Sequence, residues 1–494
     1  MNARLVRVMS DRYRAIVSYS GLMFILTGLL MLTPLFVLSA WPQEIDQSGA
    51  FLIPAAVLLL MGLILRLLFR PRRKVVLSVQ EGGIIVVISW VVACVFSAIP
   101  FMLLLGFNFT QAVFESVSGW STTGLTLVDV LSASHLILIW RSITQYAGGA
   151  GLAIIMLSAI TGPSGTGLAI AEGRTDQLVP HVRESAKRVM ILYLGYAIYG
   201  IIAYVFAGMP VFDAVNHSMT AVATGGFSTR PESIGYWDSA LIDSITITLM
   251  ILGNLNFLTA YLILKGKLGA VYRNGEIRVL FVSVCTGAFL ILLFGVFDLY
   301  PTFSKALRVS VFECVSAISG CGFTSTVYTS WRGIGYLVLT ILMIIGGATC
   351  STSGGLKQYR VYLLYKTVSW EIRKAILPPS AVIENYVWQG DGRDYIRDKR
   401  VVQAAAYIYI YILSFLIGTA VLACYGHSMT DAMFEFASAQ GTVGLTVGIT
   451  RIDSPGILLW TEIFGMFLGR LEFFIVFVSL LKVGKDLAAR LRRR

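Results

Sequence analysis

The sequence predicts an all-α polytopic membrane protein, in which two leading transmembrane helices precede four helix–pore-loop–helix repeats around a central pore with pseudo-fourfold symmetry. Three observations lead to this fold class. The 494 residues are 56% hydrophobic and only 13% charged, whereas soluble domains carry about 25% charged residues. Apolar runs of about 20 residues, the length that crosses a bilayer, recur along the whole chain. A Thr- and Gly-rich phrase returns four times between them.

The leading pair of spans is expected at 17–40 and 50–69, within a first segment 1–74. The first run has no small-residue cleavage pattern and a second span follows at once, so it is not a cleavable signal peptide. The repeats are expected at 75–160, 161–264, 265–365 with a broken second helix, and 366–494 with a preceding cytoplasmic linker. Their spans are predicted at 83–105 and 136–160, 189–208 and 238–264, 277–297 and 332–365, and 401–425 and 454–482.

The recurring phrases read STTGLTL (121–127), ATGGFST (223–229), SGCGFTS (319–325) and GTVGLTV (441–447). They are named the first to fourth phrases below. Alignment on one glycine in each phrase also aligns the residues before it, which indicates internal duplication. The aligned glycines are Gly124, Gly226, Gly322 and Gly444, and nine residues before them stand Glu115, His217, Glu313 and Glu435.

Each phrase follows a helical stretch of about ten residues, which is too short to cross a bilayer and should dip in and return. Non-helical backbone at membrane depth is tolerated where it lines a watery cavity. Glycine allows carbonyl oxygens to point inward, and rings of carbonyls replace the hydration shell of an alkali cation. Packing of small residues between helices, the alternative explanation, does not predict four equivalent placements. The predicted ion-binding residues are Thr122, Thr123, Gly124, Thr224, Gly225, Gly226, Gly320, Cys321, Gly322, Thr442, Val443 and Gly444.

The three glutamates that precede the phrases have two interpretations. They can stabilise the N-terminal ends of the short helices through the helix dipole, or they can coordinate ions. The sequence favours the first interpretation for Glu115, Glu313 and Glu435.

Two further features depart from plain spans. The run MIIGGATCSTSGGLKQYR (343–360) cannot be a regular helix because glycines flank its small polar residues. It does not match the phosphate-loop motif GxxxxGK[ST], so it is not expected to bind phosphate. It is expected to obstruct the pore or move aside. Arg470 lies deep in the last span, where it either ties two helices together or contacts the broken segment and repels cations. The predicted gating residues are Gly346, Gly347, Gly354, Gly355, Lys357 and Arg470.

The net charge of +12 follows membrane topology. Basic residues gather at 4–14, 70–74, 174–188, 265–278, 357–400 and the C-terminal tail. The segments expected on the outer side hold few, namely Arg230, Lys305, Arg308 and Arg451. This is the positive-inside bias, so the protein is expected to be multi-pass with both termini in the cytoplasm. Because topology accounts for the charge and no recognition motif accompanies it, nucleic-acid binding is not expected.

Other functional classes lack their residues. The six cysteines include no CxxC pair and the four histidines are scattered, so no zinc site, disulfide framework or enzyme centre is indicated. No span carries an Arg at every third position, as a voltage sensor would. Glu462 and Glu472 are the acidic candidates for ion coupling, so a proton- or sodium-coupled cation symporter of the same architecture remains the alternative.

The chain resembles the Trk/Ktr/HKT superfamily of potassium transporters, in particular its TrkH/TrkG-type membrane subunits. The resemblance rests on the four phrases, the Gly-rich interruption and the runs WRSITQYAGGAGLAIIMLSAI, VPHVRESAKRVMILYLGY, LGNLNFLTAYLILKGK and GRLEFF. The resemblance implies uptake of K⁺ across the plasma membrane, the bacterial inner membrane, with no organic cofactor in this chain. It also implies a homodimer and a cytosolic ring of TrkA-type nucleotide-binding regulators. By motif match, the four glycines are filter glycines, 346–355 is the gating loop and Arg470 is the pore arginine. Cys321 departs from the usual Thr or small residue, which implies looser discrimination between potassium and sodium.

Overall fold

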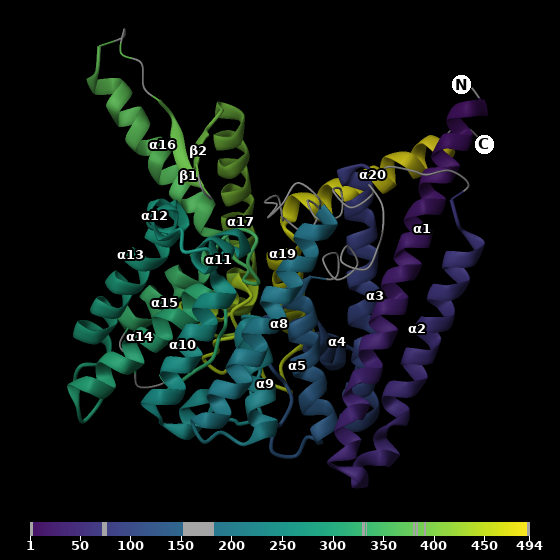
Figure 1. Cartoon of the computed structure of the whole chain (residues 1–494), viewed down its shortest axis with the longest axis horizontal. Coiled ribbons are helices and arrows are strands. Elements are labelled where there is room, and N and C mark those ends of the chain that lie inside the picture. Colours follow the sequence, from purple (N-terminus) through teal and green to yellow (C-terminus); the bar gives the residue numbers. More distant parts are fainter. Residues whose placement is uncertain are drawn as a thin grey trace.

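The computed structural model describes residues 3–71, 77–151, 182–328, 331, 333–378, 381, 384–389 and 392–491. These residues are mostly helical, which confirms the predicted all-α class, and Figure 1 shows the helices gathered into one bundle. The α-helices are α1 Ala3–Leu32, α2 Gly49–Leu68, α3 Val79–Leu105, α4 Phe109–Trp120, α5 His135–Ala150, α8 Val182–Phe206, α9 Val211–Val222, α10 Ala240–Asn254, α11 Phe257–Leu264, α12 Leu268–Arg273, α13 Gly275–Leu290, α14 Phe303–Ser319, α15 Gly333–Ile345, α16 Gln358–Ile376, α17 Asp398–Cys424, α18 Met429–Gly441, α19 Gly456–Leu471 and α20 Phe473–Leu491. Shorter helical turns are η1 Thr33–Ser39, η2 Pro42–Gln47, η3 Ser233–Trp237 and η4 Ile291–Val296, and the strands are β1 Tyr386–Gln389 and β2 Gly392–Tyr395.

The leading helices α1 and α2 pack closely through glycines. A Cβ atom added to Gly62 would lie 2.5 Å from the carbonyl oxygen of Gly21, so the two backbones touch there. Such close approach of small residues is a common way for membrane helices to associate. The pair lies beside α3 on one flank of the bundle in Figure 1.

Six helical segments among the described residues are long and apolar enough to span a membrane, and eight if each of two bent helix pairs counts as one span. The second helices of the repeats are shorter. α5, α10, α15 and α19 contain 16, 15, 13 and 16 residues, or about 20–24 Å at 1.5 Å per residue. A hydrocarbon core about 30 Å thick is longer than any of them. Each of these helices therefore ends at membrane depth.

The spans predicted at 238–264 and 454–482 are each broken into two helices. α10 and α11 meet at 115°, and α19 and α20 meet at 97°. The side chain of Asn256 accepts a hydrogen bond from the backbone of Leu258 and so starts a new helix, while Glu472 has a left-handed φ of 61°. The chain also leaves the helix between α15 and α16, at 346–357. The span expected at 136–160 runs into residues 152–160, which lie outside the described residues.

The linker between α16 and α17 holds an antiparallel hairpin, β1–β2, that the sequence analysis did not predict. Figure 1 shows the hairpin and both chain termini on the same side of the bundle. The basic runs at 72–74 and 174–181 and the last three residues lie outside the described residues. Towards the opposite side, Lys305, together with Arg308, lowers the pKa of the Asp238 carboxyl by hydrogen bonding and charge.

Candidate functional site

The four short helices α4, α9, α14 and α18 end in the same backbone arrangement. The residue before each aligned glycine donates its N–H to the carbonyl five residues earlier, and the residue before that donates to the carbonyl three residues earlier. This pair of bonds is the Schellman motif, whose extra residue adopts the left-handed conformation. Left-handed φ values of 53–70° occur at Thr122, Thr224, Gly320 and Thr442. Because a β-branched residue rarely adopts this conformation, the three threonines mark a strained and specific turn.

The four phrases contact one another in a closed cycle. A Cβ atom added to Gly124 would lie 2.2 Å from the carbonyl oxygen of Gly225, and one added to Gly226 would lie 2.1 Å from that of Cys321. The corresponding distances are 1.8 Å from Gly322 to Val443 and 2.1 Å from Gly444 to Thr123. All four glycines also have φ between 72° and 96°. The twelve predicted ion-binding residues therefore belong to one ring of backbone in which the four aligned positions have no room for a side chain.

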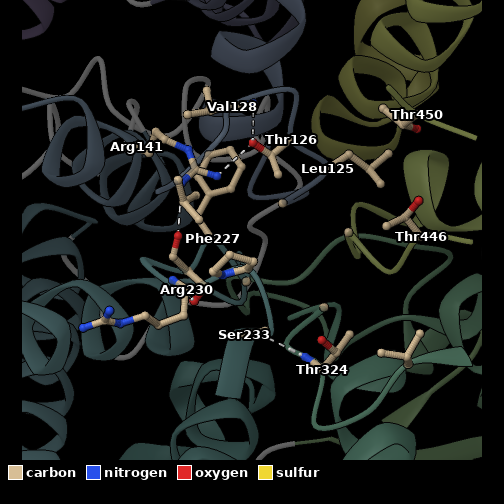
Figure 2. A pocket seen from close by; sticks show the side chains of 18 of the residues that line it. Leu125, Thr126, Val128, Arg141, Phe227, Arg230, Ser233, Thr324, Thr446 and Thr450 are labelled. Carbon is tan, nitrogen blue, oxygen red and sulfur yellow. Dashed lines mark hydrogen bonds between the residues drawn. The ribbon is translucent and has the colours of Figure 1, made fainter. Parts of the chain in front are cut away.

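A pocket of about 390 Å³ lies against this ring. Figure 2 shows that side chains from all four repeats converge on it, among them Thr126, Phe227, Thr324 and Thr446. The aligned glycines line the pocket, whereas the residues two positions before them do not. The ring thus presents its glycines and the segments that follow them to this pocket.

The glutamates do not stabilise the ends of the short helices, so the favoured interpretation is wrong. Glu115 and Glu435 lie in the middle of α4 and α18, and Glu313 lies in the second half of α14. All three are fully buried. The expectation failed because the helices begin further upstream than their apolar pattern indicates.

Each glutamate instead holds the segment that follows its glycine. Glu115 accepts hydrogen bonds from the hydroxyl of Thr126 and the backbone N–H of Leu127, both at 2.9 Å. Glu313 accepts from the backbone and the hydroxyl of Ser325 at 2.8 Å, and from the hydroxyl of Tyr328. Glu435 accepts from Thr446, Val447 and Thr450. Buried carboxylates therefore fix the shape of three of the four segments.

In the second repeat a histidine replaces the glutamate. Nδ1 of His217 lies 2.8 Å from the carbonyl oxygen of Asp213 and must donate to it, which leaves Nε2 of the neutral ring to accept from the hydroxyl of Ser228 at 2.9 Å. The segment after Gly226 is therefore held by an imidazole ring in place of a carboxylate.

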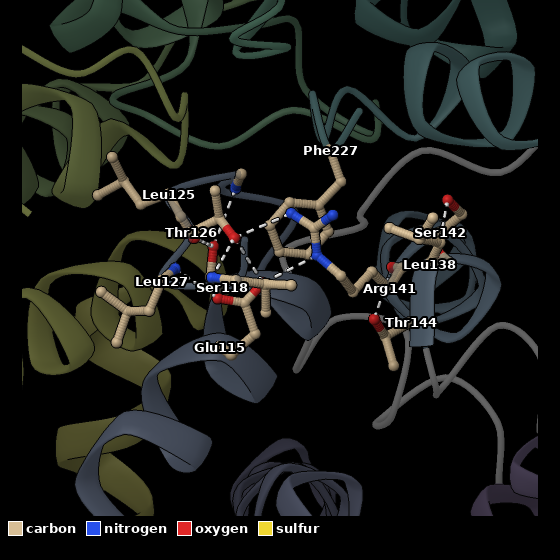
Figure 3. A network of polar contacts seen from close by, with 12 residues as sticks. Glu115, Ser118, Leu125, Thr126, Leu127, Leu138, Arg141, Ser142, Thr144 and Phe227 are labelled. Atoms are coloured by element: carbon tan, nitrogen blue, oxygen red, sulfur yellow. Dashed lines mark hydrogen bonds and ion pairs between the residues drawn. The ribbon is translucent and has the colours of Figure 1, made fainter. Parts of the chain in front are cut away.

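Arg141 of α5 is a residue of the site that the sequence analysis missed. Its guanidinium lies 2.9 Å from Glu115 and donates to Thr126 at 2.9 Å (Figure 3). It donates as well to the carbonyl oxygen of Ser228 at 3.1 Å. It also stacks over the Phe227 ring at 4.0 Å. It thus joins the segments of the first two repeats. The available signal was an arginine inside the apolar run HLILIWRSITQY.

The segment 346–357 lies against the helix side of the ring. The hydroxyl of Thr352 lies 3.1 Å from the carbonyl oxygen of Val222 and 3.2 Å from the Thr224 hydroxyl. A Cβ atom added to Gly354 would meet the Thr442 hydroxyl at 2.2 Å, and one added to Gly320 would meet the Ser353 hydroxyl at 2.7 Å. The third phrase has glycine where the other three have threonine, and the Ser353 hydroxyl lies beside this glycine.

Arg470 joins this segment to α5. Its guanidinium donates to the carbonyl oxygens of Thr352 at 2.6 Å and Gly148 at 2.7 Å. Lys357 donates to the carbonyl oxygen of Ser353. Glu472 lies 2.9 Å from Arg360 in an ion pair. The structure therefore brings Arg470 and the broken segment together on the side of the ring opposite the pocket.

The sequence model of the TrkH family, described as a cation transport protein, matches residues 48–485 of this chain. The chain belongs to the TrkH family. As a family member it is a multi-pass membrane transport protein and not an enzyme.

The chain is similar to named transport proteins over most of its length. The chain is 32% identical to the Trk system potassium uptake protein TrkH of Salmonella typhimurium, over 94% of this chain and 98% of that protein. It is 30% identical to a cation transporter of Methanocaldococcus jannaschii, over 93% and 94% of the two chains. The crystal structure of the potassium transporter TrkH from Vibrio parahaemolyticus superposes with a TM-score of 0.80 at 28% identity, covering 95% of this chain and 98% of that one. This TrkH-family chain therefore shares its fold with a solved transporter over nearly its full length.

Proposed function

We propose that this TrkH-family protein takes up K⁺ through a selectivity filter formed by the four phrases. The observation that carries the proposal is the closed cycle in which Gly124, Gly226, Gly322 and Gly444 each touch the backbone of the next phrase. A ring of backbone oxygens around an axis replaces the hydration shell of an alkali cation. An inside-negative membrane potential supplies about 2.3 kcal/mol per 100 mV for each inward charge, so uptake needs no ATPase in this chain.

Segment 346–357 acts as the gate of this filter, with Arg470 as the pore arginine. The segment is largely buried directly beside Thr224, Gly320 and Thr442, where it stands in the way of an ion that leaves the ring. The contacts of Arg470 with Thr352 and Ser353 hold the segment in that place and add a positive charge there. Opening requires these contacts to break.

The face that carries the hairpin and the termini is assigned to the cytoplasm by the positive-inside rule. Several relatives are named as parts of a Trk system for potassium uptake, which supports a cytosolic TrkA-type nucleotide-binding ring as the partner on this face. The partner shifts the gate by binding its closed and open states with different affinity. Assembly as a homodimer in the bacterial inner membrane completes the proposal.

Radioactive rubidium uptake into proteoliposomes at a fixed inside-negative voltage tests the filter. Potassium is expected to compete and sodium to compete poorly. Gly226→Ser should relax this preference, because its Cβ would press on the Cys321 carbonyl from 2.1 Å. Gly269→Ser, at an open position in α12, is the matched control. If rubidium does not enter even with a TrkA-type partner present, or if Gly226→Ser keeps the preference, the filter assignment fails.

Gly320→Ala tests the gate. The new Cβ would lie 2.7 Å from the Ser353 hydroxyl, so this hydroxyl must turn away and the packing of segment 346–357 against the third phrase is weakened. We expect rubidium uptake without the partner to rise severalfold, and we expect the second substitution Ser353→Gly to return it towards the wild-type rate by restoring space. Uptake that stays at the wild-type rate in the folded Gly320→Ala variant would contradict the gating role.

A further inference from the structure

Two buried carboxyl groups meet behind the fourth phrase. Glu435 on α18 and Glu462 on α19 are both fully buried, and the Thr450 side chain lies between them. The hydroxyl of Thr450 lies 2.6 Å from Oε1 of Glu435 and 3.0 Å from Oε1 of Glu462. Oε2 of Glu462 is buried and has no hydrogen-bond partner among the described residues. The fourth repeat therefore places one carboxyl group on either side of the Thr450 hydroxyl.

Glu435 has the surroundings of an ionised carboxylate. Besides the Thr450 hydroxyl, it accepts hydrogen bonds from the hydroxyl of Thr446 at 2.7 Å and from the backbone N–H groups of Val447 at 2.9 Å and Thr450 at 3.1 Å. In each of these contacts the partner of Glu435 can act as the hydrogen-bond donor. An ionised carboxylate can only accept hydrogen bonds, so it fits all of them. Glu435 therefore needs no proton of its own.

The hydrogen atoms around Thr450 then locate a proton on Glu462. A threonine hydroxyl has one hydrogen atom, and the shorter contact gives it to Glu435. At the 3.0 Å contact with Glu462, the Thr450 oxygen must then accept. A carboxylate has no hydrogen to give, whereas a carboxylic acid has one. The contact is a hydrogen bond only if Glu462 is un-ionised.

The charge balance of the site leads to the same result. In the first repeat the second helix supplies Arg141, which compensates Glu115 at 2.9 Å. In the fourth repeat the second helix supplies Glu462, an acid. Among the residues that the structure describes, Glu462 forms no ion pair. Of the helices packed against α19, α17 carries its charged residues in its first turn, α20 carries them from its middle onward, and Glu115 of α4 is paired with Arg141. Arg470 of α19 itself donates to backbone carbonyl oxygens. Two buried carboxylates without a cation would repel strongly, and one proton removes the repulsion.

We propose that Glu462 is a proton-holding positioning residue, which donates to Thr450 and through it to Glu435. The chain of donors orients the carboxylate that holds Thr446, Val447 and Thr450, the segment after the fourth-phrase glycine. Thr446 and Thr450 line the pocket. The consequence for ion selectivity rests on the proposed function, whereas the protonated state of Glu462 does not. Glu462, one of the two acidic candidates for ion coupling, therefore belongs to the residues that support the filter.

Infrared spectroscopy of the purified protein tests the proton directly. The wild type is expected to show the C=O stretch of an un-ionised carboxylic acid at neutral pH, and Glu462→Gln should lose that band. Glu472→Gln is the matched control, because Glu472 is ion-paired with Arg360 and should not contribute to the band. Absence of the band from the wild type, or a band of unchanged intensity in Glu462→Gln, would overturn the proposal. This readout is independent of transport, so a failure of the filter proposal leaves it intact.

Thermal unfolding and ion competition give the second test. Glu462→Gln replaces one neutral hydrogen-bond donor with another and should melt close to the wild type, whereas Glu115→Gln strips the buried Arg141 of its negative partner and should melt several degrees lower. Thr450→Val cuts the chain of donors and should weaken the preference of rubidium uptake for potassium over sodium by severalfold. Equal destabilisation by the two Gln variants, or an unchanged preference in folded Thr450→Val, would contradict the positioning role.

Discussion

Gly322→Ala is expected to lower rubidium uptake at least about tenfold. A methyl group on Gly322 would stand 1.8 Å from the Val443 carbonyl oxygen, closer than any real contact, and the residue has a φ of 75°. The left-handed conformation alone costs a non-glycine residue about 1–2 kcal/mol, and about 1.4 kcal/mol corresponds to a factor of ten in an equilibrium. The backbone of the third and fourth phrases must therefore separate. The measurement is voltage-driven uptake into proteoliposomes.

The control for this variant is Gly456→Ala. Gly456 is the first residue of α19, and a Cβ added there would meet nothing within 4 Å. It should keep the wild-type rate and melting temperature. Both variants must elute as a single species from size exclusion before their uptake is compared. Uptake by Gly322→Ala equal to that of Gly456→Ala would show that the closed cycle is not required for conduction.

Arg141→Met is expected to destabilise the protein by about 3–5 kcal/mol, since removal of one partner of a buried ion pair leaves the other charge uncompensated. Glu115 would remain fully buried without its cation, and the carbonyl oxygen of Ser228 would lose its donor. Methionine keeps an unbranched apolar side chain in the same place but removes the charge and the hydrogen-bond donors of Arg141. The measurement is thermal or denaturant-induced unfolding of the detergent-solubilised protein.

The double variant Arg141→Met/Glu115→Gln distinguishes charge from packing. Glutamine keeps an acceptor for the Leu127 N–H while it removes the negative charge. We expect the double variant to regain most of the stability that Arg141→Met loses. If the double variant is no more stable than the single one, the ion pair is not the reason for the loss.

Local sequence patterns predicted much of the fold and of the candidate site. Long apolar runs with few charges define membrane helices without knowledge of their neighbours, and the run 49–68 was placed within one residue of its helix. The phrases could be found because a positive φ and a crowded backbone restrict a position to glycine, which leaves a mark in the sequence at Gly124 and Gly444. The break after Ile345 was visible for the same reason, since clustered glycines disfavour a helix.

What the sequence missed depends on partners far apart along the chain. Glu115 and Arg141 are 26 residues apart, and Thr352 and Arg470 are 118 residues apart. Composition windows measure how apolar a segment is but not where it bends, so the breaks at Asn256 and Glu472 were read as continuous spans. A buried glutamate looks the same whether it stabilises a helix end or receives hydrogen bonds from a distant segment.

By itself, the sequence determined the membrane class, the four phrases and the positions that only glycine can fill, because each depends on local hydropathy or backbone conformation. Only the tertiary structure decided which phrase follows which in the ring, that Ser353 fills the space beside Gly320, and that Glu462 meets Glu435 across Thr450. These contacts depend on distances between residues that the chain brings together only on folding, and no local pattern encodes such distances.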